Sequence, residues 1–235
     1  MKACVCACSD GEKKMLKENV EAVQHLLEKE SEKWGRVPRL IAVTKFATPE
    51  MILPLYDLGV KDIGENKVQV LREKLPQLEG KFQIHLIGRL QSNKVKYIID
   101  DVCMIHSLDR MSLAQEIDRQ ARMRGKRMDV LVQVNVAREP QKGGVAEEEL
   151  LPFLRACAAL PGLQVKGLMA IMPLDADREE LSGYFSRMRT LFDDVTKENI
   201  ENIQMQELSM GMSRDFDLAA RYGATMVRVG SRLFQ

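Results

Sequence analysis

The chain alternates between short runs rich in β-branched residues and longer amphipathic stretches. The short runs predict eight strands, and a stretch with helical periodicity follows each strand except the last. A leading helix is predicted over residues 12–33, because its apolar residues recur on one face. The predicted strands cover residues 39–44, 60–63, 82–87, 102–106, 128–136, 163–169, 206–209 and 225–229. The predicted helices between them begin at residue 48 or cover 67–75, 93–99, 110–123, 147–159, 178–197 and 214–222.

This alternation predicts a single α/β domain. Repeated βα units favour a parallel sheet, and eight of them favour a closed (β/α)8 TIM barrel. An open doubly wound sheet is the alternative, but neither G-x-G-x-x-G nor G-x-x-x-x-G-K-[ST] occurs in the chain. We therefore expect a barrel domain over residues 12–235, preceded by a flexible cysteine-containing segment over residues 1–11.

Charge and hydropathy narrow the class of protein. Lys and Arg number 35 and Asp and Glu 34, so the formal net charge of +1 gives no general reason to bind nucleic acid or a membrane surface. No apolar run approaches the roughly 18 residues that a membrane span needs. The first residues also lack the charged and then apolar order of a signal peptide. We expect a cytoplasmic protein.

The five cysteines do not indicate a metal site. Cys4, Cys6 and Cys8 could present three thiols on one side of an extended strand, but no Cys or His pair follows at a zinc-site spacing. Reduced thiols on a frayed terminus are the simpler interpretation. The three histidines, at positions 25, 85 and 106, are not spaced as a set of metal ligands either.

The candidate chemistry lies at the ends of the predicted strands, where barrels of this kind carry their sites. Lys45 ends the first strand directly after an apolar run. A lysine there is either a surface side chain or an amine removed from water, and removal from water favours the uncharged nucleophile that a Schiff base requires.

Small residues follow the seventh and eighth strands, over residues 209–213 and 228–231. Such segments bind phosphate in many barrels, although a helix cap by Ser213 and a tight turn at Gly230 would also explain them. Together with Lys45 they favour a phosphorylated aldehyde, and pyridoxal phosphate has both groups. His85 alternates with apolar residues on the third strand, so a hydrogen-bonded structural role is the simpler interpretation for it.

The sequence resembles the pyridoxal phosphate homeostasis protein family over nearly the whole chain from about residue 12. Several motifs occur in order at the predicted strand ends, which makes the resemblance specific. They are Ala42-Val43-Thr44-Lys45, Gly64-Glu65-Asn66 with Gln69, His85-Leu86-Ile87-Gly88 with Leu90-Gln91-Ser92-Asn93-Lys94, Gly167-Leu168-Met169-Ala170, Leu208-Ser209-Met210-Gly211-Met212-Ser213 and Val227-Arg228-Val229-Gly230.

The resemblance implies a fold-type III barrel like the N-terminal domain of alanine racemase, without the C-terminal β domain. It implies that Lys45 holds pyridoxal 5'-phosphate as a Schiff base and that Arg228 approaches the pyridine nitrogen. The other implied contacts are Ser209, Gly230 and Ser231 for the phosphate, Met210 and Gly211 for the shape of its loop, Asn66, His85 and Met169 for the ring, and Lys142 and Ser213 as secondary contacts.

Two positions depart from the family pattern. Ala47 stands where a second lysine is common, which puts in doubt any transfer of the cofactor through a neighbouring amine. Arg89 stands where a proline is usual, and this change affects the shape of a loop.

The resemblance implies a non-enzymatic carrier or buffer that delivers pyridoxal phosphate to apo-enzymes. An amino-acid racemase on the same barrel is the alternative, and a barrel that binds another phosphorylated metabolite without a covalent bond is the third. Racemisation needs a base on each face of the substrate, and Lys45 serves one face. The four tyrosines all fall in predicted helices, and the sequence ends shortly after the eighth strand. We therefore expect a carrier, and a monomer, since the racemase dimer depends on the second domain.

Overall fold

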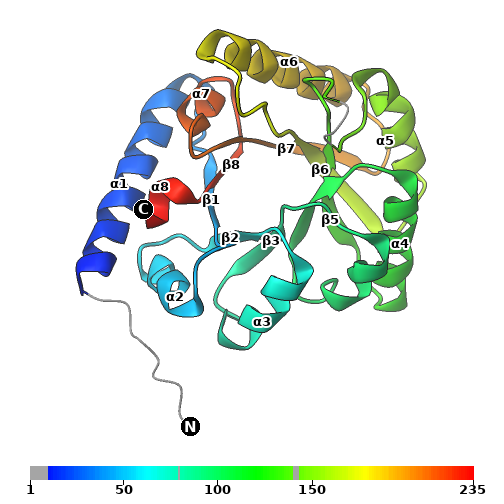
Figure 1. Cartoon of the computed structure of the whole chain (residues 1–235). Coiled ribbons are helices and arrows are strands. Elements are labelled where there is room, and N and C mark those ends of the chain that lie inside the picture. Colours follow the sequence, from blue (N-terminus) through cyan, green and yellow to red (C-terminus); the bar gives the residue numbers. More distant parts are fainter. Residues whose placement is uncertain (1–9, 79, 140–142) are drawn as a thin grey trace.

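A closed parallel barrel forms the centre of the protein (Figure 1). The computed structural model describes residues 10–78, 80–139 and 143–235. Each strand pairs with the next in sequence, and β8 pairs with β1, so the predicted (β/α)8 fold is confirmed. The strands are β1 (Arg39–Val43), β2 (Asp62–Glu65), β3 (Gln83–Leu86), β4 (Met104–Leu108), β5 (Met128–Gln133), β6 (Leu163–Met169), β7 (Ile203–Met212) and β8 (Met226–Val229).

Helices surround the barrel (Figure 1). They are α1 (Asp10–Ser31), α2 (Pro49–Asp57), α3 (Val68–Leu78), α4 (Met111–Met123), α5 (Leu150–Ala158), α6 (Arg178–Lys197), α7 (Phe216–Arg221) and α8 (Ser231–Phe234), with 3-10 turns η1 (Glu32–Trp34), η2 (Ser92–Tyr97) and η3 (Glu147–Glu149). Local sequence features fix where two of these helices begin. Pro49 occupies the first turn of α2, and Asp177 and Glu180 form a capping box at the start of α6. None of the helices in the described residues is long and apolar enough to cross a membrane.

The barrel wall separates two apolar layers. The larger layer packs the outer faces of the strands against the helices, as expected for parallel strands that are buried on both faces. A smaller cluster fills the middle of the barrel. Its buried members are Ile41, Met104, Leu131, Met169 and Met226. The barrel is therefore closed by side chains at mid-height, and the two open ends are separate environments.

Several element boundaries differ from the prediction by a few residues, and two of these differences matter for the predictions above. Helix α1 begins at Asp10, so residues 10–11 of the expected flexible segment are helical, while Cys4, Cys6 and Cys8 lie outside the described residues. Strand β7 continues past Ser209 to Met212. Gly211 makes this extension possible: its φ of +90° suits glycine, and a Cβ there would lie 2.5 Å from that of Ala219. The loop after β7 therefore starts at Ser213.

Candidate functional site

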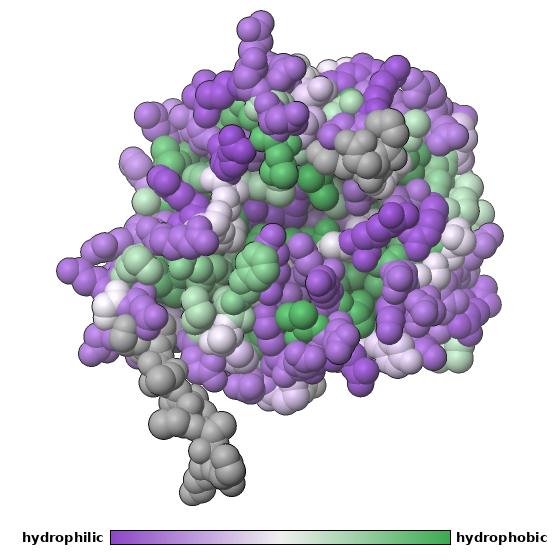
Figure 2. Space-filling view, viewed as in Figure 1, coloured by the Kyte–Doolittle hydropathy of each residue, from purple (hydrophilic) through white to green (hydrophobic). Residues whose placement is uncertain are grey.

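A cavity of about 980 Å³ opens at the carboxyl ends of the strands. Figure 2 shows the molecule from the side seen in Figure 1, with hydrophilic residues around the periphery and hydrophobic side chains gathered toward a central hollow. Four adjacent strands, in the order β2, β1, β8 and β7, end at one side of this cavity. They contribute Asn66, Lys45, Arg228, Gly230, Ser231 and Ser213 to its lining.

Lys45 follows β1 at the rim of the cavity. Its side chain is exposed, and its Nζ lies 4.8 Å from the centre of the Phe46 ring. Of the two alternatives for this lysine, the structure therefore shows the surface side chain for the protein alone. Phe46 is itself 88% exposed, so the amine stands beside an apolar surface and open solvent. Such an amine is accessible to a ligand that enters the cavity.

A buried polar cluster lies directly behind Lys45. The Lys74 Nζ donates hydrogen bonds to the Thr44 carbonyl and to Glu65 Oε1, both at 2.7 Å. Glu65 Oε1 also accepts the Thr44 hydroxyl at 2.7 Å. Glu65 and Thr44 are fully buried, and Lys74 is nearly so. Because the ends of β1 and β2 are tied together through these bonds, the backbone that carries Lys45 is held in one place.

Ser213 and Gly230 join the ends of β7 and β8. The Gly230 N–H donates to the Ser213 Oγ at 3.0 Å, which leaves the serine O–H proton to be donated elsewhere. A Cβ at Gly230 would lie 3.2 Å from the Val43 carbonyl oxygen, so this turn runs close to the end of β1. The exposed Ser231 follows at the start of α8. Hydroxyl donors and a close backbone turn on one side of the cavity suit a phosphate group.

Arg228 forms part of the floor of the cavity and is 3% exposed. Its Nη1 donates to the Ser209 Oγ at 2.6 Å, and its Nη2 donates to the Ala170 carbonyl at 2.7 Å. Burial lowers the pKa of Arg228 to about 10, and the nearby Asp215 acts in the opposite direction. The guanidinium therefore remains a cation at neutral pH, held in place by two bonds that use two of its five N–H donors.

Five of the residues that the resemblance implied lie elsewhere. Ser209, Met210 and Gly211 belong to β7, because that strand is longer than predicted, and they do not line the cavity. Met169 lies in the apolar cluster at the middle of the barrel. His85, expected beside the ring, lines a second cavity of about 240 Å³ instead. Lys142 lies outside the described residues.

The sequence prediction missed Lys74, although the sequence contains a signal for it. Leu71, Lys74 and Leu78 follow one another at helical spacing and form the buried face of α3. A lysine within such an apolar stripe indicates a buried cation that must have an acidic partner. Gln133 was missed as well; it lines the cavity and donates to the Gly143 carbonyl at 2.8 Å, and nothing in the spacing of β5 signals this.

The barrel and its cavity define the class of protein: a (β/α)8 barrel whose mouth presents a lysine beside turns of small residues. A family model described as alanine racemase, N-terminal domain, matches residues 14–235. A pyridoxal phosphate homeostasis protein of Aquifex aeolicus is 41% identical over 92% of this chain and 96% of its own, and one of Helicobacter pylori is 35% identical over 93% and 98%.

Comparison with solved structures leads to the same family and fold. PipY of Synechococcus elongatus, solved with PLP bound, is 32% identical, has a TM-score of 0.84, and is matched over 94% of this chain and all of that one. Alanine racemase from Corynebacterium glutamicum has a TM-score of 0.73 at 14% identity over 60% of its length, which shows a shared fold. The chain belongs to the pyridoxal phosphate homeostasis protein family, within the proteins that share the alanine racemase N-terminal domain.

Proposed function

We propose that this protein binds pyridoxal 5'-phosphate at the mouth of its barrel and buffers the cofactor for delivery to apo-enzymes. The observation that carries the proposal is the position of Lys45, exposed at the rim of a cavity whose adjacent strand ends supply Ser213, Gly230 and Ser231. The names of the relatives and the PLP in the PipY structure support it. We further propose that it acts in the cytoplasm as a monomer.

Lys45 is the residue that would hold the cofactor covalently. Its Nζ would supply the amine for a covalent bond to the aldehyde, whose oxygen would leave as water. When bound, the cofactor supplies that aldehyde and an aromatic ring that can accept electrons. Because water would reverse such a bond, the same lysine would both retain and release the aldehyde. Reversible retention of a reactive aldehyde is what a buffer requires.

The remaining residues would set affinity and limit reactivity. Ser213 has a hydroxyl proton free to donate to a phosphate, and the backbone at Gly230 and Ser231 lies on the same side of the cavity. Arg228 would face the ring nitrogen. Because an arginine retains its own protons, a nitrogen next to it stays largely unprotonated, and the ring is then a weak electron acceptor. This arrangement suits storage better than catalysis at the α-carbon of an amino acid.

Borohydride trapping tests the covalent step. The purified protein is incubated with pyridoxal phosphate, the double bond is reduced, and the modified peptide is mapped by mass spectrometry. We expect the label on Lys45, its loss in Lys45→Ala, and its retention in Lys166→Ala, a lysine at the opposite end of the barrel that bonds Gln204. A label that survives in Lys45→Ala at full yield would refute the proposal.

Deuterium incorporation separates storage from racemisation. A racemase needs a second base opposite Lys45, and no tyrosine among the described residues lines the cavity. We expect L-alanine to keep its α-proton when it is incubated with the loaded protein in deuterated buffer. Steady α-deuteration with turnover, lost in Lys45→Ala, would establish the racemase alternative instead.

A further inference from the structure

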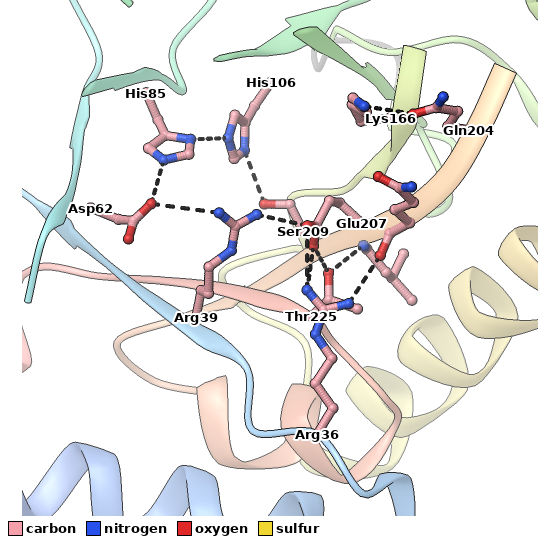
Figure 3. Close-up of polar contacts among 12 residues, drawn as sticks. Arg36, Arg39, Asp62, His85, His106, Lys166, Gln204, Glu207, Ser209 and Thr225 are labelled. Atoms are coloured by element: carbon pink, nitrogen blue, oxygen red, sulfur yellow. Dashed lines mark hydrogen bonds and ion pairs between the residues drawn. The ribbon is translucent and has the colours of Figure 1, made fainter. Parts of the chain in front are cut away.

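A line of polar side chains crosses the inside of the barrel, and Figure 3 shows the part of it from Ser209 to Asp62. It starts at Arg228, whose Nη1 donates to Ser209 Oγ at 2.6 Å. Ser209 Oγ lies 3.1 Å from His106 Nδ1, and His106 Nε2 lies 2.9 Å from His85 Nδ1. His85 Nε2 lies 2.9 Å from Asp62 Oδ1, the last member of the line, and this oxygen also lies 3.8 Å from Arg39 Nη1. Five strands, β8, β7, β4, β3 and β2, each contribute one member.

The two ends of this line fix the direction of every bond in it. A guanidinium only donates hydrogen bonds and an ionised carboxylate only accepts them. Burial holds the pKa of His106 well below its usual value, with His85 and Arg228 acting in the same direction, so His106 is neutral and has one N–H. Ser209 then accepts from Arg228 and donates to His106 Nδ1. His106 Nε2–H donates to His85, and His85 Nε2–H donates to Asp62.

The opposite direction of these hydrogen bonds is unfavourable when both imidazoles are neutral. If His106 carried its proton on Nδ1, its Nε2 would need a donor from His85 Nδ1. The unprotonated His85 Nε2 would then face the Asp62 carboxylate, with two acceptors 2.9 Å apart. Only a second proton on His85 would relieve this contact. With a single proton on each ring, the geometry therefore selects one tautomer for both imidazoles.

The line connects two separate environments. Arg228 lines the mouth cavity, whereas Asp62 and His85 line the smaller cavity at the amino ends of the strands. Between them, His106 and Ser209 are fully buried at the level of the apolar cluster of Met169 and its neighbours. Apolar side chains at this level would stabilise the fold at least as well as these polar groups do. Every buried polar group also needs a hydrogen-bond partner. Such a line inside a core is expected where it fixes a functional group.

We propose that Ser209, His106, His85 and Asp62 are positioning residues that hold the Arg228 guanidinium in one orientation through a one-directional hydrogen-bond chain. This inference deepens the proposed function, on which it rests for the statement that Arg228 faces the cofactor ring. It assigns Ser209 to the support of the arginine rather than to the phosphate. It also connects cofactor affinity to Asp62, a residue outside the mouth cavity.

Nuclear magnetic resonance on the full chain without cofactor reports the direction of these hydrogen bonds directly. With ¹⁵N-labelled histidine we expect both His85 and His106 to carry their proton on Nε2. With ¹⁵N-labelled arginine we expect separate Nη signals for Arg228, because its bonds restrict rotation, and faster exchange between these signals in Ser209→Ala, which keeps only the bond to Ala170. An Nδ1–H tautomer at His106, or Arg228 signals unchanged by Ser209→Ala, would overturn the inference.

A double-mutant cycle on pyridoxal phosphate affinity tests the connection to Asp62. We expect Ser209→Ala to weaken binding about tenfold, since it removes a hydrogen bond to a charged group. Asp62→Ala should weaken it about threefold alone and have no further effect in the Ser209→Ala background. Asp62→Asn retains an acceptor and should retain most of the affinity. Ser31→Ala, a buried serine of α1 that bonds Leu27, is the matched control.

The outcomes separate this inference from the proposed function. Thermal unfolding of each variant verifies that it is folded at the temperature of the assay. Independent effects of Ser209→Ala and Asp62→Ala, multiplying to about thirtyfold, would refute the chain while Lys45 trapping still supported the function. The expected tautomers in a protein that does not trap pyridoxal phosphate would support the chain and refute the function.

Discussion

The two ends of the barrel use charged residues in opposite ways. At the amino ends of the strands, Glu207 accepts Arg36 Nη2 at 3.1 Å, Arg39 Nη2 at 2.7 Å and the Thr225 hydroxyl at 2.6 Å (Figure 3). At the mouth, neither Lys45 nor Arg228 has a carboxylate partner among the described residues. Barrels of this class place stability at the first end and binding at the second. In this protein Glu207 already neutralises Arg36 and Arg39 at the amino ends, whereas no carboxylate among the described residues pairs with Lys45 or Arg228 at the mouth.

The mouth contains ion pairs too, and the one next to Lys45 lies behind the binding surface. Lys74 and Glu65 meet at 2.7 Å with side chains that are 11% and 0% exposed. This pair holds the strand ends, and Lys45 in front of it remains accessible. The comparison therefore predicts that substitutions in the paired residues affect folding, whereas substitutions on the surface of the mouth affect the ligand.

Lys74→Met should have the largest effect, on folding. It leaves the Glu65 carboxylate buried without its cation, which costs about 3 kcal/mol in unfolding free energy. Glu65→Leu combined with Lys74→Met should recover most of the loss, because neither charge is then left unpaired. Chemical denaturation measures both, with Lys67→Met, an exposed lysine before α3, as the control. A double variant as unstable as the single one would contradict this account.

A new carboxylate at the mouth should have the next largest effect, on binding. Ser231→Glu places a negative charge where we propose the phosphate, and we expect affinity to fall about 100-fold, or about 2.7 kcal/mol. The same added charge at the opposite end, in Gln204→Glu, should leave affinity unchanged, because Lys166 is its partner there. Fluorescence titration with pyridoxal phosphate measures both variants. Equal losses in the two would show that net charge, rather than position, controls binding.

The fold could be predicted from sequence because its signal is repeated. Each βα unit changes from β-branched runs to helical periodicity, and eight consecutive units leave little freedom of topology. The end of β7 could not be predicted in the same way. Its extension depends on the contact between Gly211 and Ala219 of α7, which is a tertiary contact. An error of three residues at this strand moved Ser209 from the mouth to the interior.

The site residues that follow directly from the strand ends could be predicted from sequence. The residues whose place depends on how deep a side chain lies inside the barrel could not. Lys45 and Gly230 follow strands that pair directly, so their convergence follows from the barrel alone. The depth of a side chain inside the barrel depends on register. His85 pairs with Met104, which places His106 two residues further along β4 and within reach of both His85 and Ser209. No pattern within one strand contains that information.

Glu207→Ala should destabilise the protein with little effect on the ligand. Removing the carboxylate leaves two arginines and a threonine without their shared acceptor, but Arg36 and Arg39 are 49% and 41% exposed and regain water. We therefore expect a loss of about 2 kcal/mol rather than the larger cost of a fully buried pair. Glu207→Gln should lose less, because its amide oxygen can still accept the Thr225 hydroxyl. A change of more than threefold in cofactor affinity would contradict the separation of the two ends.

The pH dependence of stability should show the smallest effect and reports on the interior between the two ends. Burial, His85, Arg228 and Arg39 all lower the pKa of His106 from its usual 6.5, so the unfolded chain binds a proton there that the folded chain does not. Stability should therefore fall as the pH drops below about 6.5, by about 1 kcal/mol between pH 7 and 5.5. Denaturation at each pH should show a smaller slope in His106→Asn and an unchanged one in His25→Asn, an exposed histidine of α1. Equal slopes in the native protein and His106→Asn would mean that folding does not lower the pKa of His106, and the neutral His106 on which the chain from Arg228 to Asp62 depends would lose this support.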